Sequence, residues 1–390
     1  MTNVASTLLR LTLARACAWG LLVAGWIGIG SFALQFAPSV ATGFGLVALW
    51  LVALGGAATV ATRGGIGWWT RALALCLCAG TTGIGLWSTV HGGGLFALLL
   101  ALAGWATLTA LASGVVRSLR LQYPVPPGPP IAAASLGALC AGLVLGDLGD
   151  LPALMIRLIV FVGAATGLLV ILQRRIEPRP RPGCRAGLFD CSLPAWPRGA
   201  WRDSLQWPTL LAGLAMLPMM AALPMMAAWC RAQSVAPQAM VLLHLAAMFG
   251  PALLLRHAVA QWSPRVLSTV CAALLASGAA FAVFAPAPFD LLGLAALHGA
   301  AWGLAWVGQL WAPARRGQQG TSPLRAAAGY AVLTVAFGVV VELSGARGVV
   351  NVHAALGVAA VFAWLLGTAG PALTFPRKRG DQQAHRHSEP

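Results

Sequence analysis

Arg174-Arg-Ile-Glu-Pro-Arg-Pro-Arg-Pro-Gly183 stands near the middle of a 390-residue chain and opens a long polar stretch, 174–206. Proline cannot donate a backbone hydrogen bond and fixes its own backbone angle, so this composition favours an extended linker with little structure of its own. On both sides of it the chain consists of long apolar spans. The stretch therefore divides the protein into two halves.

The apolar spans have the length needed to cross a bilayer. The chain is 59% hydrophobic and 9% charged, whereas an ordinary soluble domain carries about 25% charged residues. The runs are continuous and rich in Ala and Leu, which favours helices over strands. We expect an all-α polytopic membrane protein whose twelve transmembrane helices form two six-helix bundles. The spans are expected at 12–36, 40–62, 69–91, 94–116, 131–150 and 152–173, then 207–230, 237–256, 265–285, 289–312, 324–344 and 349–370.

The basic residues indicate how the chain is oriented. All but Arg157, Arg231 and Arg347 of the 25 Lys and Arg residues lie at the termini, in 174–206 or in every second connection. Positive residues stay on the cytoplasmic side, so both termini and the middle stretch are expected in the cytoplasm. The net charge of +16 is spread over short loops, which argues against a nucleic-acid partner. The first span is too long for a signal-peptide core and is expected to be retained.

The expected organisation is an N-terminal half, a linker, a C-terminal half and a tail. Their ranges are 1–173, 174–206, 207–375 and 376–390. Two six-helix halves with both ends in the cytoplasm resemble the major facilitator superfamily. That resemblance implies a substrate site between the halves near the midplane, with the halves rocking around it.

Two motifs near the middle of adjacent spans could carry chemistry. Met216-Leu-Pro-Met-Met220 reads Met-x-x-x-Met, and His244-Leu-Ala-Ala-Met248 reads His-x-x-x-Met. Residues four apart share one helix face, and thioether and imidazole ligands together suit a soft metal such as Cu(I). The simpler interpretation is that the methionines fill gaps in an apolar core and that the histidine is a structural hydrogen-bonder. Further candidates for lining a cavity are His298, Met219 and Met226.

Together the two motifs look like the corresponding region of the CcoA-like copper importers, a bacterial branch of the major facilitator superfamily. That branch carries Met-x-x-x-Met in span seven and His-x-x-x-Met, followed by Phe and Pro, in span eight. The match here covers about 40 residues. The glycine- and arginine-containing connection 63–71 lacks the Asp that superfamily members usually have there. The residues that carry the match are Met216, Met220, His244 and Met248, with Phe249 and Pro251 flanking them.

The resemblance implies a multi-pass secondary transporter of the bacterial inner membrane. It would import copper for a cuproenzyme such as a haem–copper oxidase, with copper as the transported substrate and no resident cofactor. Its partners would be the lipid bilayer and a copper ion or small molecule. Carriers of small organic compounds such as riboflavin belong to the same branch and give an alternative substrate class. A second alternative is a non-transporting assembly factor on a carrier scaffold, which the apolar N-terminal half and the departures in the loops motivate.

Other polar residues of the spans give weaker signals. His298 is central in the tenth span, where it could join a cavity or bond a backbone carbonyl. Glu342 and His353 lie near the outer ends of spans eleven and twelve; they could guide protons or cations, although such positions are commonly interfacial. Cys76 and Cys78 are two apart and point to different helix faces. Phosphate-loop, nucleophile-elbow and zinc-protease motifs are missing from the sequence, so we do not expect an enzyme.

Overall fold

Every regular element in the described part of the chain is helical. The computed structural model describes residues 2–61, 67–122, 128–145, 148, 150–174, 206–213, 216, 220, 225, 236–316 and 323–373. The first half contains α1 Thr2–Phe36, α2 Val40–Ala61, α3 Trp68–Ser88, α4 Gly94–Gln122, α5 Gly128–Leu145 and α6 Leu151–Gln173. The second contains α8 Pro237–Leu254, α9 Arg256–Gln261, α10 Pro264–Phe284, α11 Phe289–Arg316, α12 Pro323–Ser344 and α13 Gly348–Leu373.

These helices agree with the predicted spans. Eight apolar stretches are long enough to cross a membrane, and one of them, Trp68–Leu119, holds both α3 and α4. Two further apolar helices, Ile131–Leu145 and Gln238–Leu254, are shorter. The seventh span is described only in part, with 207–213 and Met216, Met220 and Met225 in helical conformation. The expectation of an all-α, multi-pass membrane protein is confirmed, and the helices are consistent with twelve spans.

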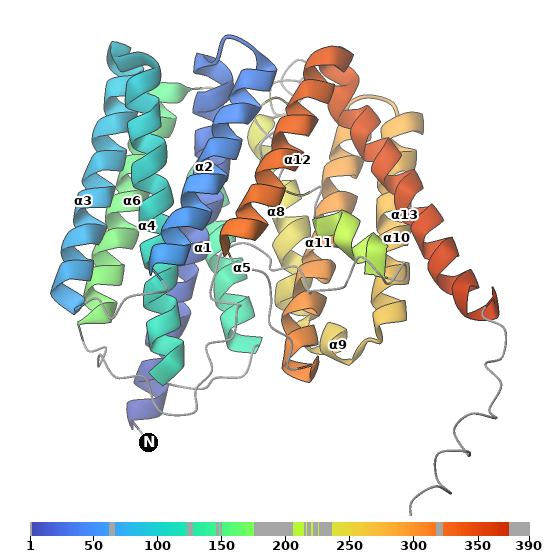
Figure 1. The fold of residues 1–390 in the computed structure, drawn as a ribbon, viewed down its shortest axis with the longest axis horizontal. Helices are drawn as coiled ribbons and strands as arrows, with labels where there is room; N and C mark the ends of the chain where they lie inside the picture. The colour runs from blue at the N-terminus through green and yellow to red at the C-terminus, as the bar shows by residue number, and fades with distance from the viewer. Residues whose placement is uncertain are drawn as a thin grey trace, which may run out of the picture.

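The helices form two groups that stand side by side (Figure 1). In the first group α1 packs against α2, α4, α5 and α6, and in the second α11 packs against α8 and α10. The groups meet where α2 runs along α12 and where α5 packs on α8. Residue 2 and the C-terminal end of α13 lie at the same end of the molecule, which we call the termini side; the opposite end is the far side. The domain boundaries themselves stay a prediction, because 175–205 lies outside the described residues.

A tight turn separates α3 from α4. A π-helical segment, Thr89–Gly93, ends α3, and the backbone φ angles are +97° at Gly92 and +59° at Gly94. Side chains with a Cβ rarely adopt this region, so glycine permits the reversal. The long apolar run is thereby cut into two antiparallel helices, as the sequence predicted.

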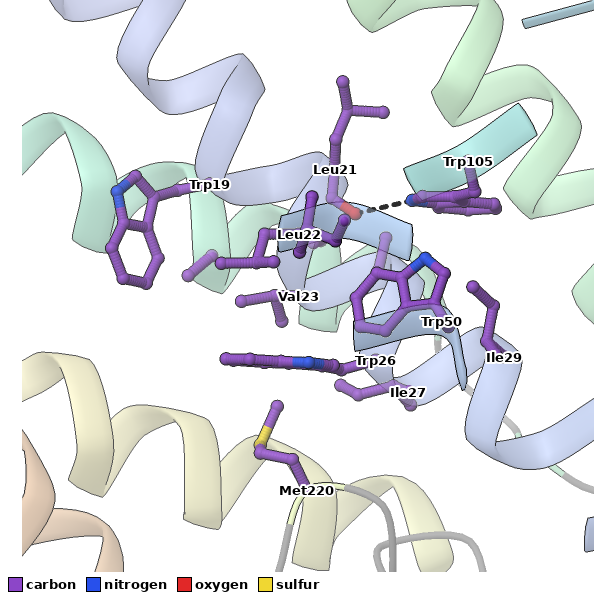
Figure 2. Packing of buried hydrophobic residues seen from close by; sticks show 14 of the residues in the cluster. Trp19, Leu21, Leu22, Val23, Trp26, Ile27, Ile29, Trp50, Trp105 and Met220 are labelled. Atoms are coloured by element: carbon purple, nitrogen blue, oxygen red, sulfur yellow. Dashed lines mark hydrogen bonds between the residues drawn. The ribbon is translucent and has the colours of Figure 1, made fainter. Parts of the chain in front are cut away.

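Large aromatic residues fill the core of the first half (Figure 2). Trp26, Trp50 and Trp105 are each at most 2% exposed. The indole N–H of Trp105 on α4 donates to the carbonyl oxygen of Leu21 on α1 at 2.8 Å. The rings of Trp26 and Trp50 meet edge to face, with centroids 6.4 Å apart. This bond and these contacts hold α1, α2 and α4 together within the first half.

Candidate functional site

One face of α8 carries three buried donor side chains. His244 and Met248, which the sequence analysis singled out, are fully buried, and so is Met240 one turn earlier. Spacings of four residues place all three on the same side of the helix. Met240 was missed, although the spacing Met-x-x-x-His was visible in the sequence. Along α8 this face therefore carries, in order, the sulfur of Met240, the imidazole of His244 and the sulfur of Met248.

Two glycines of α11 bring this face close to a second helix. A Cβ built at Gly299 would lie 2.9 Å from the carbonyl oxygen of His244 and 3.3 Å from its Nδ1 atom. A Cβ at Gly303 would collide with the carbonyl oxygen of Met248. Small residues allow helix backbones to approach closely inside a membrane. The α8–α11 contact thus holds the His244 and Met248 backbones in place.

The same contact fixes the imidazole of His244. Its Nδ1 atom lies 2.8 Å from the carbonyl oxygen of Ala295 on α11. A carbonyl can only accept, so Nδ1 carries the proton and donates. In the neutral ring the other nitrogen, Nε2, then presents a lone pair, and Nε2 is buried with no hydrogen-bond partner within the described residues. Metal-binding histidines usually have this arrangement, in which a backbone carbonyl holds one nitrogen and leaves the other to the metal.

The methionines of the seventh span are also inside the protein. Met216 and Met220 are fully buried and belong to the same apolar core as Met248. Figure 2 shows the side chain of Met220 directed from the second half toward Trp26 of the first. Met219 and Met226 lie outside the described residues. The structure therefore buries all four residues of the two motifs, with Met220 at the boundary between the halves.

Two further histidines lie in the same half. His298 on α11 and His353 on α13 are each 2% exposed. Their rings meet edge to face with centroids 4.8 Å apart, and Gly299, next to His298 on α11, packs against the backbone and ring of His244. The sequence position of His353 suggested an interfacial residue, but the fold buries it against α11. The sequence did contain a signal for this clustering: the halves of spans eight, ten and twelve that are nearer the far side contain one histidine each.

Aromatic side chains pack together next to Met248 in the chain and against His353. Trp19 of α1 lies 4.8 Å from Trp306 and 6.1 Å from Phe249, measured between ring centroids. Phe249 in turn meets Trp302 of α11 at 5.6 Å. On the far side Phe337 of α12 contacts His353 at 6.0 Å. These rings come from four helices, α1, α8, α11 and α12.

The described residues contain no set of three or more His, Cys, Asp or Glu side chains with the geometry of a metal centre. The cysteines among them are free thiols: Cys17, Cys76, Cys78, Cys140 and Cys271. The described residues therefore provide no ligand set of this kind for a permanently bound metal. What the site offers is a group of neutral sulfur and nitrogen donors, which suits a soft or borderline cation held weakly enough to be released.

Comparisons with solved structures identify the fold. The nucleoside transporter NupG is 15% identical, with a TM-score of 0.61 and coverage of 93% of this chain and 99% of NupG. The xylose transporter XylE from E. coli, in a partially occluded inward-open conformation, is 14% identical, with a TM-score of 0.62 and coverage of 92% and 98%. Tetrameric PepTSo2 is 13% identical, with a TM-score of 0.60 and coverage of 96% and 99%.

At these identities the likeness shows the fold alone, and it is the fold of the major facilitator superfamily, as predicted. No protein-family model matches the sequence. The search of curated proteins likewise found no match.

Proposed function

We propose that this chain is a secondary transporter of the bacterial inner membrane that imports copper for cuproenzyme assembly. Its fold is shared by NupG and XylE, which are described as transporters. In such folds the substrate binds near the midplane between the halves, and the halves rock around it. The motifs Met216/Met220 and His244/Met248 lie in the second half with Met220 facing the first, as this arrangement requires.

The observation that carries the copper proposal is the state of His244. Its ring is fully buried, its Nδ1 atom is engaged by the Ala295 carbonyl, and its Nε2 atom has no partner in the described structure. An unsatisfied buried polar atom costs free energy on the order of 1–3 kcal/mol. A function that needs the lone pair explains why this cost is tolerated. Together with the buried sulfurs of Met216, Met220 and Met248, this nitrogen would give a donor set that Cu(I) prefers.

In the proposed mechanism Nε2 of His244 and the sulfur of Met248 bind the ion from α8. Met216 and Met220 bind it through sulfur from the seventh span. All four ligands are neutral, so the ion leaves no buried protein charge behind when it departs, and release stays easy. Rocking of the halves at the α2–α12 and α5–α8 contacts would then expose the ion to alternate sides.

The test is copper accumulation in a deletion strain complemented with variants of the chain. Met248→Leu keeps the side-chain volume but removes the sulfur, and such swaps usually cost less than about 1.5 kcal/mol of stability. We expect His244→Asn and Met248→Leu each to reduce the initial rate of uptake at least tenfold at unchanged expression. Asparagine can still donate to the Ala295 carbonyl, so a loss would report on Nε2 rather than on packing.

Met155→Leu is the matched control, because Met155 is a buried methionine of α6 in the other half. Its uptake should equal that of the wild type. Uptake that is indifferent to both His244→Asn and Met248→Leu would eliminate copper as the substrate of this site.

A small planar organic compound is the second candidate substrate. The indole N–H groups of Trp26 and Trp50 are buried without partners in the described structure, and ring stacking with donor groups is how such compounds are commonly held. Uptake of riboflavin by the same strains separates the two candidates. A carrier of organic compounds should lose uptake in Trp26→Ala and keep it in Met248→Leu. A non-transporting assembly factor should move neither substrate.

A further inference from the structure

Three histidines from three helices gather in the second half, and only His244 belongs to the motifs discussed above. His244 comes from α8, His298 from α11 and His353 from α13. All three side chains are at most 2% exposed, and in each ring Nε2 is buried without a hydrogen-bond partner among the described residues. A structural histidine normally satisfies both nitrogens when it is buried. Three adjacent exceptions therefore need a common explanation.

His353 repeats the geometry of His244. Its Nδ1 atom lies 2.7 Å from the carbonyl oxygen of Val349, one turn earlier on α13. That nitrogen must donate, so Nε2 of the neutral ring holds a lone pair. The two histidines thus present ligand nitrogens of the same tautomer, each set by a backbone carbonyl. The His298 ring meets the His353 ring with centroids 4.8 Å apart, and the next residue of α11, Gly299, packs against His244.

The cluster lies closer to the far side than Met248 does. His353, His244 and His298 lie roughly 8, 11 and 14 Å along their helices from the far-side ends, at the rise of an α-helix. Met248 is one turn further toward the termini side than His244 on α8. A ligand arriving from the far side would therefore meet the imidazoles before it meets the sulfur of Met248.

A contact between the two halves covers the cluster. Phe337 of α12 packs edge to face on His353, with centroids 6.0 Å apart. Phe337 also packs on Phe44 of α2, at 5.4 Å. Separation of α2 from α12 would remove Phe44 from Phe337, while Phe337 itself stays beside His353 in the second half. At the far-side ends of the helices the carboxylates of Asp290 and Glu342 stand together with the guanidinium group of Arg347, which lies between α12 and α13.

From this arrangement we infer that His353 and His298 form an acquisition site for a soft or borderline transition-metal ion, which then passes to His244 and Met248. The inference rests on the proposed function, because it describes how a metal ion would reach the same site. The three rings do not form a three-ligand centre, so an ion is held by two imidazoles at a time. Linear two-coordinate ligation by imidazole is a favourable geometry for Cu(I) and Ag(I), and two weak ligands release an ion readily.

The geometry requires a small rearrangement. Two imidazoles that share one ion through nitrogen have ring centroids roughly 6 Å apart, given metal–nitrogen bonds of about 2 Å. The His298 and His353 centroids are 4.8 Å apart. Rotation of the His298 ring about its χ angles would supply the difference, while His353 stays held by the contact of its Nδ1 atom with the Val349 carbonyl oxygen.

The first test measures binding without transport. Purified full-length protein with ¹⁵N-labelled histidine is titrated with Ag(I), a redox-inert stand-in for Cu(I), and with Cu(I) under reducing conditions. We expect the Nε2 signals of His298 and His353 to shift on metal addition while the Nδ1–H signal of His353 remains. Signals are assigned with His298→Asn and His353→Asn, of which the second keeps a donor for the Val349 carbonyl.

His91 provides the matched control. Its Nδ1 atom contacts the carbonyl oxygen of Trp87 at 2.8 Å, one turn earlier in the helix, as in His353, but its ring is exposed and lies in the other half. Its Nε2 signal should respond only at far higher metal concentration, and His91→Asn should behave as the wild type. Shifts no greater at His298 and His353 than at His91 would overturn the inference whatever the protein transports.

The second test measures uptake. We expect the His298→Asn/His353→Asn double variant to raise KM for copper at least tenfold with a smaller change in kcat, because acquisition is impaired while the methionine site is intact. His353→Met, which restores a soft donor, should recover most of the affinity for Cu(I).

The outcomes separate the two proposals. Unchanged KM in a folded double variant of a copper-transporting protein contradicts the acquisition site and leaves the proposed function standing. Metal-induced shifts at His298 and His353 in a protein that accumulates no copper contradict the proposed function and support the histidine site. If the double variant does not fold, as judged by gel filtration, the single variants give the same readouts.

Discussion

At the scale of single residues, the most informative feature is a lone pair that the fold does not use. Burial of His244, His298 and His353 leaves one ring nitrogen of each without a partner in the described structure. Ionisable or polar residues inside a membrane are expensive and usually functional. The backbone carbonyls of Ala295 and Val349 hold two of these rings by their other nitrogen. The result is a set of oriented donors rather than flexible ones.

The close packing of α11 against α8 beside these donors depends on glycines, which have no side chain. Gly303→Ala should destabilise the protein by about 1–3 kcal/mol, because the added Cβ meets the Met248 carbonyl and α8 must shift. Thermal unfolding in detergent measures the loss as a lower Tm.

Gly250→Ala on α8 is the control for this prediction. A Cβ there has no atom within 4 Å, and replacing a helical glycine in open space commonly stabilises by about 0.4–1 kcal/mol. Equal Tm values for the two variants would show that the α8–α11 contact is looser than described.

At the scale of elements, the contact between α2 and α12 governs the far side. A carboxylate oxygen of Glu342 accepts the backbone N–H of Ala41 at 3.0 Å, close to the start of α2, where unpaired N–H groups attract negative charge. Deeper along the same pair of helices lies the Phe44–Phe337 contact. One exposed polar bond and one buried aromatic pair thus connect the two halves on this side.

Glu342→Ala should loosen the far-side contact without unfolding the protein. Glu342 is exposed, so we expect an effect of about 1 kcal/mol or less. Hydrogen–deuterium exchange should rise up to fivefold in the first turns of α2 and stay unchanged in α3. Ser344→Ala, at the same end of α12, is the control, and equal exchange in both variants would mean that the bond to Ala41 does not hold the halves.

At the scale of the whole molecule, the two halves touch on both sides of the donor sites. The far side is closed by α2 and α12, and toward the termini side Trp19 of α1 packs on Phe249 and Trp306. Alternating access requires each closure to open in turn. In this structure the two halves are therefore in contact on the far side and also toward the termini side.

Trp19→Ala should favour opening toward the termini side. Removal of this ring deletes buried contacts between α1 and both α8 and α11, so we expect exchange in 247–254 and 304–316 to rise about tenfold, equivalent to about 1.4 kcal/mol. Exchange in the first turns of α2 should stay the same or fall. Trp69→Ala is the control because that ring is 70% exposed; a rise at both ends in Trp19→Ala would indicate general destabilisation instead.

The class of protein and the order of its helices were predictable from the amino-acid sequence. Apolar spans of bilayer length are a local signal, because helix formation in lipid depends on composition, whereas the linker expected at 174–206 stays a prediction. Met216, Met220, His244 and Met248 were visible because a spacing of four places residues on one face.

Which residues meet across helices depends on how the folded chain packs. The burial of His353 against α11 could not be predicted, because its place near a span end says nothing about the neighbour that it faces. Met240, by contrast, could have been found from its Met-x-x-x-His spacing. The lone pairs at Nε2 depend on which carbonyls, Ala295 and Val349, reach each ring. The cover over the cluster depends on Phe44 and Phe337, which are almost 300 residues apart in the chain and meet only because the two halves pack together.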